Sequence, residues 1–444
     1  SKEGVGKASL RTLLLTHNVG GLFEDGPADA IDQWLLTLVS LARDADFVVV
    51  HMQEMGGNTW RLGLTAPASA MASSAGRIFL ASDWWFSGIF CDADASDPPP
   101  SSTTSFTAMA CMIFVRTAVL HRVALCTLSE GVRPAGWTPL NELSNPLISS
   151  PSIPVAYCLH KPFARTFFNE VVPMWTRKGF MFTSWRLDGR ELNLLNVHLF
   201  HDESNLVSLR RTGDLSDYAT SRQRALAHAI ASIPAAAAAG TLFLFGDFNF
   251  RLDQQEVVRS LAGEAELSRV LALSAEEKEL VLNVAESAPA STDAPPSMLG
   301  KRSSSSDGVG ESGRAIRPAA AALELAIAAK KFLVGHNTTH VHSVLRQLRE
   351  KCDIELSRYC DQVGAAQLHE LPISFPPSYA LATGGARTYG VRRCPAWCDR
   401  VLMTVEAKSM LAPGAVYTSV QQELVLTDHD GVYLCFTLGE ESQR

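Results

Sequence analysis

Short apolar runs that end directly in polar residues recur along the whole 444-residue chain. Such runs are typical of buried strands, and segments with helical spacing lie between them. The expected strands are 10–19, 47–50, 192–199, 241–245, 399–404 and 432–438, and the expected helices are 29–43 and 216–233. Because strands alternate with helices and end in polar clusters, the pattern predicts a layered α/β fold with its functional site at the strand ends.

One stretch differs from the rest in composition. Residues 287–314 are rich in Ser, Pro, Ala and Gly and have almost no large apolar side chain. Such a segment cannot bury enough surface to offset its ordering entropy, so we expect a disordered loop there. We expect it to be an insertion within a single domain that spans 1–444. After it, residues 318–334 are predicted to form an Ala-rich helix that stops at Gly335.

Charge and composition limit the partners of this chain. The formal net charge of -7 disfavours binding to nucleic acid, which usually requires a basic surface. No apolar run reaches the roughly 18 residues of a membrane span, and the N-terminus lacks the order of a secretory signal. The nine cysteines are scattered, which favours reduced thiols in a cytoplasmic protein. A polyanion would therefore need a local basic pocket, which favours a small, highly phosphorylated ligand.

The segment 245–251, Phe-Gly-Asp-Phe-Asn-Phe-Arg, is the most specific candidate for chemistry. Asp247 and Asn249 lie two residues apart just past a strand, so both side chains can reach one reacting centre. A carboxylate that orients water beside a neutral donor suits hydrolysis of a charged ester. The alternative is an ordinary strand-to-helix turn, in which Gly, Asp and Asn are also common.

Three other clusters add polar groups. Asp428-His429 precedes the last strand, and a histidine beside a carboxylate is common in proton transfer and anion binding. His198 lies on an expected strand, where a lone histidine is more often structural. Asn18 and Glu54 end the first two strands, and their hard oxygen atoms, with waters, suit magnesium.

The order of these motifs carries a resemblance. In sequence order, NVG, QE, NVHL, GDFNFR, PAWCDR and TDH resemble the six signatures of the inositol-polyphosphate 5-phosphatases. The resemblance is closest to the type I enzymes, through 175–180 (WTRKGF), 197–206 (VHLFHDESNL) and 373–379 (ISFPPSY). It implies the four-layer α/β/β/α sandwich of the endonuclease/exonuclease/phosphatase type. It also implies a magnesium-dependent phosphomonoesterase that removes the 5-phosphate of inositol 1,4,5-trisphosphate and inositol 1,3,4,5-tetrakisphosphate, which terminates inositol phosphate and calcium signalling.

The resemblance assigns roles to individual residues. It implies that Glu54 is the main Mg²⁺ ligand, with Asn18 and Asp428 close to the metal. Asp247 would orient and deprotonate water, and Asn249 would stabilise the transferring group. His198 and His429 would hold phosphoryl oxygens, with Asp399 orienting His429. The residues expected to meet the ring phosphates are Arg177, Lys178, Arg392 and Arg393.

The sequence departs from the family at a few positions. The last motif reads Asp428-His429-Asp430-Gly431, where the family usually has a proline at the Gly431 position and often a lysine at the Asp430 position. Ala380 stands where lipid-cleaving relatives carry a lysine, which favours soluble substrates, as in type I enzymes. No cysteine stands at the end of the chain for prenylation. We therefore expect at most peripheral membrane association. We also expect the protein to be a monomer.

Three alternatives stay open. The first is a phosphoinositide-lipid 5-phosphatase. The second is a hydrolase of the same fold with another substrate, a nuclease or a sphingomyelinase-like phosphodiesterase; the PAWCDR motif and the net charge count against it. The third is a catalytically silent protein that binds inositol phosphates. The presence of Glu54, Asp247, Asn249 and His429 counts against that one.

Overall fold

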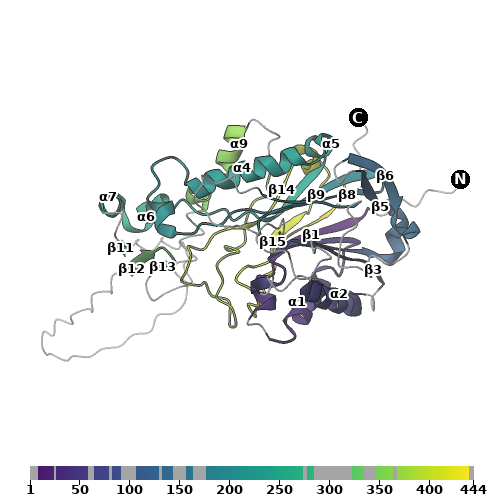
Figure 1. Cartoon of the computed structure of the whole chain (residues 1–444), viewed down its shortest axis with the longest axis horizontal. Helices are drawn as coiled ribbons and strands as arrows, with labels where there is room; N and C mark the ends of the chain where they lie inside the picture. The colour runs from purple at the N-terminus through teal and green to yellow at the C-terminus, as the bar shows by residue number, and fades with distance from the viewer. Residues whose placement is uncertain are drawn as a thin grey trace, which may run out of the picture.

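Two β-sheets lie face to face at the centre of the molecule, and helices cover their outer faces (Figure 1). The computed structural model describes residues 9–24, 27–58, 65–79, 83–91, 107–129, 133–143, 157–163, 177–273, 278–284, 323–334, 347, 349–363 and 368–439. The insertion expected at 287–314 lies outside these residues. Among the described helices, none is long and apolar enough to cross a membrane.

The first sheet has the strand order β15-β16-β1-β2-β4-β3. Its strands are β1 (Arg11–Asn18), β2 (Phe47–Gln53), β3 (Trp84–Cys91), β4 (Ala110–Arg116), β15 (Val416–Ser419) and β16 (Val432–Thr437). β1 and β2 are parallel with Asn18 opposite Gln53, so both strands end at the same edge. Helices α1 (Ala30–Leu41) and α2 (Thr65–Phe79) cover the outer face of this sheet.

The second sheet has the order β14-β10-β9-β8-β5-β6, with β7 paired to β8. Its strands are β5 (Val123–Ser129), β6 (Arg133–Pro139), β7 (Leu159–Pro162), β8 (Gly179–Leu187), β9 (Arg190–His198), β10 (Leu242–Asp247) and β14 (Asp399–Met403). β9 and β10 are parallel, and β14 is antiparallel to β10. Helices α4 (Asp217–Ser232), α5 (Ala235–Ala239) and α9 (Glu355–Val363) cover its outer face.

The central strands are buried along almost their whole length because both of their faces are covered. In β1, Leu14 faces the core between the sheets, whereas Leu13 and Leu15 lie under the helices. Phe243 and Phe245 of β10 meet the first sheet from the other side. The expected four-layer α/β/β/α sandwich is thereby confirmed. The expected strands and helices correspond to β1, β2, β9, β10, β14, β16, α1 and α4.

A third, small sheet lies beside the sandwich, and here one prediction was wrong. It consists of β11 (Glu279–Val284), β12 (Leu323–Ala328) and β13 (Lys331–Val334), so the described part of 318–334 is a hairpin and not a helix. Leu325 and Ile327 are fully buried at alternate positions of β12. This period-two burial outweighs the helical preference of the alanines in the segment.

The remaining elements are short and connect these layers. The helices are α3 (Asn205–Leu209), α6 (Gln254–Ala262), α7 (Glu264–Ala272) and α10 (Val405–Ser409), and the 3₁₀ helices are Gly20–Phe23, Thr117–Arg122 and Leu140–Glu142. α6 and α7 pack against β11, and α3 packs against β12. The small sheet is therefore anchored to the sandwich through these helices.

A buried histidine between the two sheets predicts acid sensitivity. The His51 ring stacks on Phe245 with 3.6 Å between ring centroids, and its Nδ1 lies 3.0 Å from the Phe245 carbonyl oxygen. Burial lowers the pKa of His51 to about 3, against the opposing effect of that hydrogen bond. The unfolded chain takes up this proton near pH ~6.5, so stability present above that pH is lost as the pH falls. We expect His51 to cost about 2 kcal/mol of unfolding free energy at pH ~5 relative to pH ~7.

Urea unfolding of the parent and of His51→Gln at both pH values measures this contribution. The variant should lose less stability than the parent on acidification, because Gln has no proton to gain. An equal loss in both proteins would show that His51 does not contribute to the acid sensitivity.

Candidate functional site

The ends of strands from both sheets meet at one edge of the sandwich. Parallel β1 and β2 bring Asn18 and Glu54 to this edge, and parallel β9 and β10 bring His198 and Asp247 to it. Strands antiparallel to these begin at the same edge, so Asp399 opens β14 directly opposite Asp247. The segment before β16 arrives here for the same reason. Residues far apart in the sequence are thus assembled by strand direction alone.

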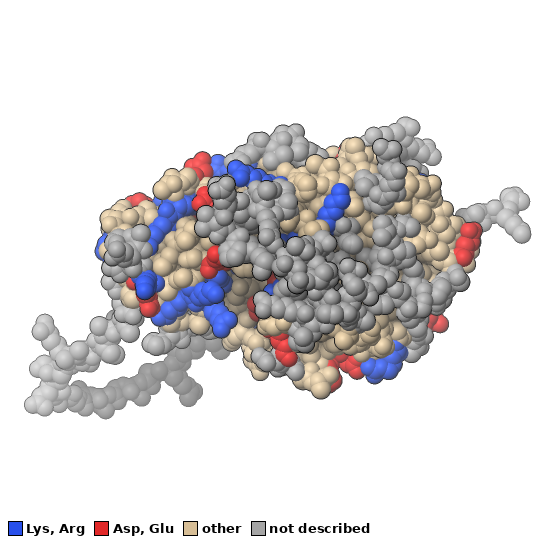
Figure 2. Space-filling model, viewed as in Figure 1, with Lys and Arg blue, Asp and Glu red and all other residues tan. Residues whose placement is uncertain are grey.

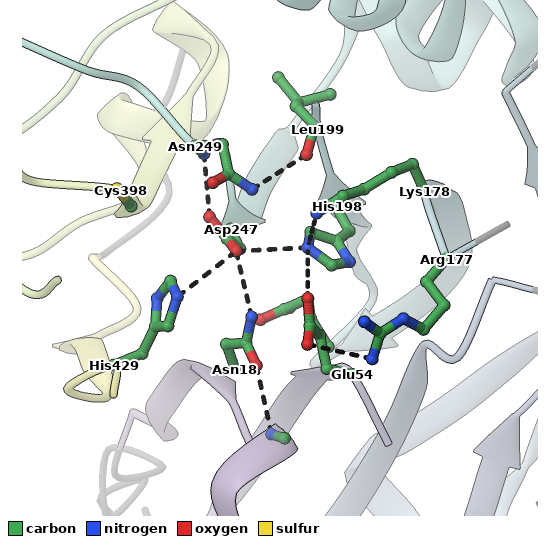
Figure 3. Close-up of polar contacts among 12 residues, drawn as sticks. Asn18, Glu54, Arg177, Lys178, His198, Leu199, Asp247, Asn249, Cys398 and His429 are labelled. Atoms are coloured by element: carbon green, nitrogen blue, oxygen red, sulfur yellow. Dashed lines mark hydrogen bonds and ion pairs between the residues drawn. The ribbon is translucent and has the colours of Figure 1, made fainter. Parts of the chain in front are cut away.

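Asp247 lies at the centre of the polar contacts (Figure 3). Its Oδ1 accepts a hydrogen bond from the Asn249 backbone N–H at 2.9 Å, and its Oδ2 accepts one from Asn18 Nδ2 at 3.2 Å. His198 Nε2 lies 3.3 Å and His429 Nε2 lies 3.9 Å from the same Oδ2. Burial alone would raise the pKa of Asp247, but the charge of His429 and the contact with His198 hold it well below its usual range. Asp247 is therefore a carboxylate at neutral pH.

Local backbone geometry fixes this carboxylate and the amide that follows it. A Cβ at Gly246 would lie 2.1 Å from the Val197 carbonyl oxygen, so only glycine allows β10 to approach β9 this closely. Asn249 has φ 52, in the left-handed region that asparagine tolerates. Its Nδ2 donates to the Leu199 carbonyl at 3.0 Å. The GDFN segment therefore has a single, well-defined geometry.

His429 and Asp399 form a buried pair beside Asp247. His429 Nδ1 lies 2.8 Å from Asp399 Oδ2, which also accepts a hydrogen bond from the Ser378 hydroxyl at 2.8 Å. Burial disfavours the charged imidazole, but the carboxylates of Asp399 and Asp247 outweigh it and raise the pKa of His429 to about 10. His429 is thus an imidazolium that points its Nε2 toward Asp247.

Glu54 lies near the side chains of Arg177, Lys178 and His198. Glu54 Oε2 lies 3.2 Å from Arg177 Nη1, and its Oε1 lies 3.7 Å from His198 Nε2. Burial opposes ionisation, but Arg177, Lys178 and His198 lower the pKa of Glu54. Lys178 Nζ contacts His198 Nε2, and burial lowers the pKa of Lys178 to about 8. Burial and the nearby Lys178 also lower the pKa of His198.

A cavity of ≈ 230 Å³ opens above these groups. Nine of the residues predicted from the sequence line it: Asn18, Glu54, Lys178, Asp247, Asn249, Arg392, Arg393, Asp428 and His429. The other three contact this lining, since Asp399 pairs with His429, His198 with Asp247, and Arg177 with Glu54. The structure therefore brings all twelve predicted positions to one place.

Four further residues, to which the sequence assigned no role, line the cavity: His201, Arg251, Lys330 and Tyr379. The Arg251 guanidinium lies 4.4 Å above the Tyr379 ring and donates to Asn249 Oδ1 at 2.6 Å. Its Nε and Nη1 have no hydrogen-bond partner among the described residues. Arg251 follows Asp247 and Asn249 at the same two-residue spacing, a signal that could have identified it. The sequence contains no comparable signal for Lys330, because a helix was predicted at 318–334, where the described residues form a hairpin.

Arg393 lines the cavity and also links neighbouring segments of the chain by hydrogen bonds. Its Nη1 donates to Asn205 Oδ1 at 3.2 Å and to the Ala329 carbonyl at 3.0 Å, and its Nη2 donates to the Glu203 carbonyl at 3.0 Å. All of these acceptors are uncharged, so the positive charge of Arg393 is not neutralised by them. This arginine holds neighbouring segments together and still contributes positive charge to the cavity wall.

The departures from the family motif have a structural explanation. Asp430 Oδ2 pairs with Arg387 Nη2 at 2.8 Å. A Cβ at Gly431 would lie 3.0 Å from His17 Nδ1, so the His17 ring occupies the space that a larger residue would need. Trp34 Nε1 donates to that Nδ1 at 2.8 Å and fixes the ring. Asp430 and Gly431 therefore shape the loop without removing His429 from the site.

The oxygen donors of the cavity wall fit a hard divalent cation. Glu54, Asn18 and Asp428 supply carboxylate and amide oxygens, the ligands that Mg²⁺ prefers. Another cluster, Asp247, Asp399 and His429, has ligand atoms within 4.8 Å of one another. That cluster is a poor metal site, because His429 is an imidazolium with its Nδ1 bonded to Asp399.

Comparisons with known proteins show what the whole chain is similar to. Residues 335–435 match the family model "Endonuclease/Exonuclease/phosphatase family 2". Inositol polyphosphate-5-phosphatase A of Rattus norvegicus is 28% identical over 447 residues, which cover 96% of this chain and 93% of the relative. The probable type I inositol 1,4,5-trisphosphate 5-phosphatase of Caenorhabditis elegans is 27% identical, covering 96% of this chain and 99% of the relative.

A solved structure is also similar. It is the inositol polyphosphate 5-phosphatase domain of SPsynaptojanin in complex with inositol (1,4)-bisphosphate and calcium ion, at 17% identity and a TM-score of 0.45, covering 97% of this chain and 84% of that one.

The fold, the site and the relatives together define a class of protein, an enzyme of the phosphatase type. Within that class, the predicted resemblance to the inositol-polyphosphate 5-phosphatases is confirmed over nearly the whole chain.

Proposed function

We propose that this chain is a Mg²⁺-dependent phosphomonoesterase that removes the 5-phosphate of soluble inositol polyphosphates, inositol 1,4,5-trisphosphate and inositol 1,3,4,5-tetrakisphosphate. The observation that carries the proposal is the buried Asp247 carboxylate at the floor of a cavity whose walls carry five Lys and Arg side chains. These are Lys178, Arg251, Lys330, Arg392 and Arg393. Similarity to phosphatases named for inositol polyphosphates supports the choice of substrate class.

In this proposal Asp247 orients the attacking water and accepts its proton. The hydrogen bonds from Asn18 and Asn249 hold the carboxylate in position, and its lowered pKa keeps it ionised before the reaction. The His429 imidazolium, oriented by Asp399, donates Nε2–H to a phosphoryl oxygen and stabilises charge that develops there. Neutral His198 acts as a second contact to the transferring group.

The proposed metal site consists of Glu54, with Asn18 and Asp428 nearby. When bound there, Mg²⁺ would neutralise charge on the phosphoryl and leaving oxygens. Glu54 meets Arg177 at its Oε2, and its side chain is 24% exposed, so it faces the cavity rather than the protein core. Binding energy and charge neutralisation must act together, because phosphate monoesters hydrolyse very slowly unaided.

Removal of the metal or of its main ligand should abolish or weaken activity. EDTA should stop phosphate release, and Mg²⁺ should restore it. Glu54→Gln should raise the Mg²⁺ concentration for half-maximal rate, because a neutral amide is a weaker ligand than a carboxylate. Titration of both proteins with Mg²⁺ measures the shift, with Glu406→Gln as a matched control, because Glu406 is exposed on α10 and does not line the cavity. Full activity of the parent in EDTA would contradict the metal assignment.

The substrate is tested with a panel. Phosphate release should be fast from soluble inositol tris- and tetrakisphosphate, slow from phosphatidylinositol 4,5-bisphosphate in vesicles, and undetectable from DNA. Ala380 is buried and offers no cation where lipid-cleaving relatives carry a lysine, which supports this order. Faster hydrolysis of the vesicle lipid would favour the lipid 5-phosphatase instead. The cytoplasmic location, the monomeric state and the single domain over 1–444 stay predictions.

A further inference from the structure

The positive charge of the cavity is not spread evenly around it. Two acidic residues, Glu54 and Asp428, come from loops at the ends of β2 and before β16, on the side of the first sheet. The arginines at 392 and 393 come from the segment that leads into β14, on the side of the second sheet. A ligand with several phosphates would therefore place its reacting phosphate at Asp247 and its other phosphates toward the basic side.

One cation on the basic side comes from the small sheet. Lys330 lies on the turn between β12 and β13 and lines the cavity, although more than a hundred residues separate it from Lys178 and sixty from Arg392 along the chain. Its side chain is exposed, and among the described residues its ammonium has no hydrogen-bond or ion-pair partner. Figure 2 shows Lys and Arg atoms gathered on the half of the molecule where Figure 1 labels β11–β13.

Hydrogen bonds from Asn205 hold the backbone on both sides of Lys330. Asn205 Nδ2 donates to the carbonyls of Ala328 (3.2 Å), Lys331 (3.0 Å) and Arg392 (3.1 Å). The Asn205 backbone N–H donates to the Ala329 carbonyl at 3.0 Å. Asn205 thus joins the turn to the segment that carries Arg392.

Two further bonds tie the same turn to the cavity wall. The Arg393 guanidinium donates to the Ala329 carbonyl at 3.0 Å, and the Phe332 N–H donates to the Val391 carbonyl at 2.8 Å. A solvated surface lysine does not require its turn to be fixed in this way. The bonding instead fixes the backbone from which the Lys330 side chain extends, and a point charge on a flexible stem can meet a phosphate without strict geometry.

We propose that Lys330 is a specificity-determining residue that contacts a phosphate of the substrate other than the one hydrolysed. The inference rests on the proposed function and deepens it, because it assigns part of the preference for polyphosphorylated rings to the small sheet. Asn205 is then a positioning residue that acts through the turn.

The test compares Lys330→Ala with a matched control in the same hairpin. Lys331→Ala removes the neighbouring charge, but the Lys331 ammonium pairs with Glu279 and does not line the cavity. With inositol 1,4,5-trisphosphate, Lys330→Ala should raise KM about five- to tenfold, in the range of a partly screened charged hydrogen bond. Its kcat should change less than about twofold, since the lost contact is the same in ground and transition states. Lys331→Ala should match the parent, and Lys330→Arg should restore most of the affinity.

Two inhibitors locate the contact. Inositol 1,4-bisphosphate, which lacks the reacting phosphate, should inhibit Lys330→Ala more weakly than the parent by the same factor. Inorganic phosphate, which occupies only the reacting subsite, should inhibit both equally. Asn205→Ala should raise KM at least as much as Lys330→Ala, because it frees the turn and also removes an acceptor of Arg393. The double variant should raise KM by less than the product of the two single effects, because the Lys330 contact is weakened in both.

The outcomes separate this inference from the proposed function. An unchanged KM in Lys330→Ala, or equal weakening of inorganic phosphate, overturns the role of Lys330 while the phosphatase proposal stands. A parent protein that releases no phosphate from any inositol polyphosphate overturns the proposed function itself.

Discussion

Replacing Asp247 by Asn should lower kcat by at least ~10²-fold while leaving the fold intact, as expected for loss of a positioned acid–base group. The carboxylate accepts bonds from Asn249 N–H and Asn18 Nδ2 and faces two histidine rings. An amide of the same shape cannot accept the proton of the attacking water. In one of its two orientations, the NH₂ group of this amide would also face Asn18 Nδ2 or His429 Nε2, which are donors themselves. The hydrogen-bond network that orients the water would therefore be lost as well.

Steady-state rates at saturating substrate and Mg²⁺ measure this effect, and thermal unfolding checks the fold. Asp214→Asn is a matched control, because Asp214 is exposed and does not line the cavity. If Asp247→Asn keeps its rate within a few-fold of the parent, Asp247 is not the group that activates water.

His429→Gln should have an effect of similar size on kcat, about 10²- to 10³-fold, in the range measured when a donor to developing charge is removed. The imidazolium is the cation that balances Asp399 and Asp247, and both carboxylates are almost fully buried. Its loss leaves Asp399 without its cationic partner and leaves Asp247 with only the nearby charge of Lys178. We therefore also expect a loss of stability of about 3–5 kcal/mol, the cost of breaking a buried ion pair.

A double-variant experiment separates the roles of the pair. Asp399 acts through His429, so Asp399→Asn should lower kcat on its own but add little in the background of His429→Gln. Residual activity and urea unfolding of the single and double variants provide the readout. Fully multiplicative losses of kcat would mean that Asp399 and His429 act independently, contrary to their 2.8 Å contact.

The sequence patterns that succeeded were those governed by local chemistry and strand direction. Fully apolar runs predicted the central strands, because helices and a second sheet cover both faces of β1 and β10. Polar residues at the strand ends predicted one shared edge, where Asn18, Glu54 and Asp247 do meet. The four-layer arrangement itself came from the family resemblance.

The patterns that failed required knowledge of packing. Residues 323–334 contain alanines that favour a helix, but burial of Leu325 and Ile327 in the hydrophobic core selects a hairpin. Lys330 could not be identified as a cavity residue from the sequence. Its position depends on the hairpin turn, which hydrogen bonds from the distant Asn205 hold in place. The structural role of Arg393 could not be predicted either, because its acceptors are two backbone carbonyls and the side chain of Asn205, all distant from it in the sequence.

The most direct measurement of the central claim is the identity of the product. Inositol 1,4,5-trisphosphate is incubated with the protein and Mg²⁺, and the products are separated by ion-exchange chromatography and identified by phosphorus NMR. The account predicts one phosphate released per molecule, with inositol 1,4-bisphosphate as the sole inositol product, and a reaction at least ~10²-fold slower by Asp247→Asn. Loss of the 1- or 4-phosphate, or no release of phosphate at all, would contradict it.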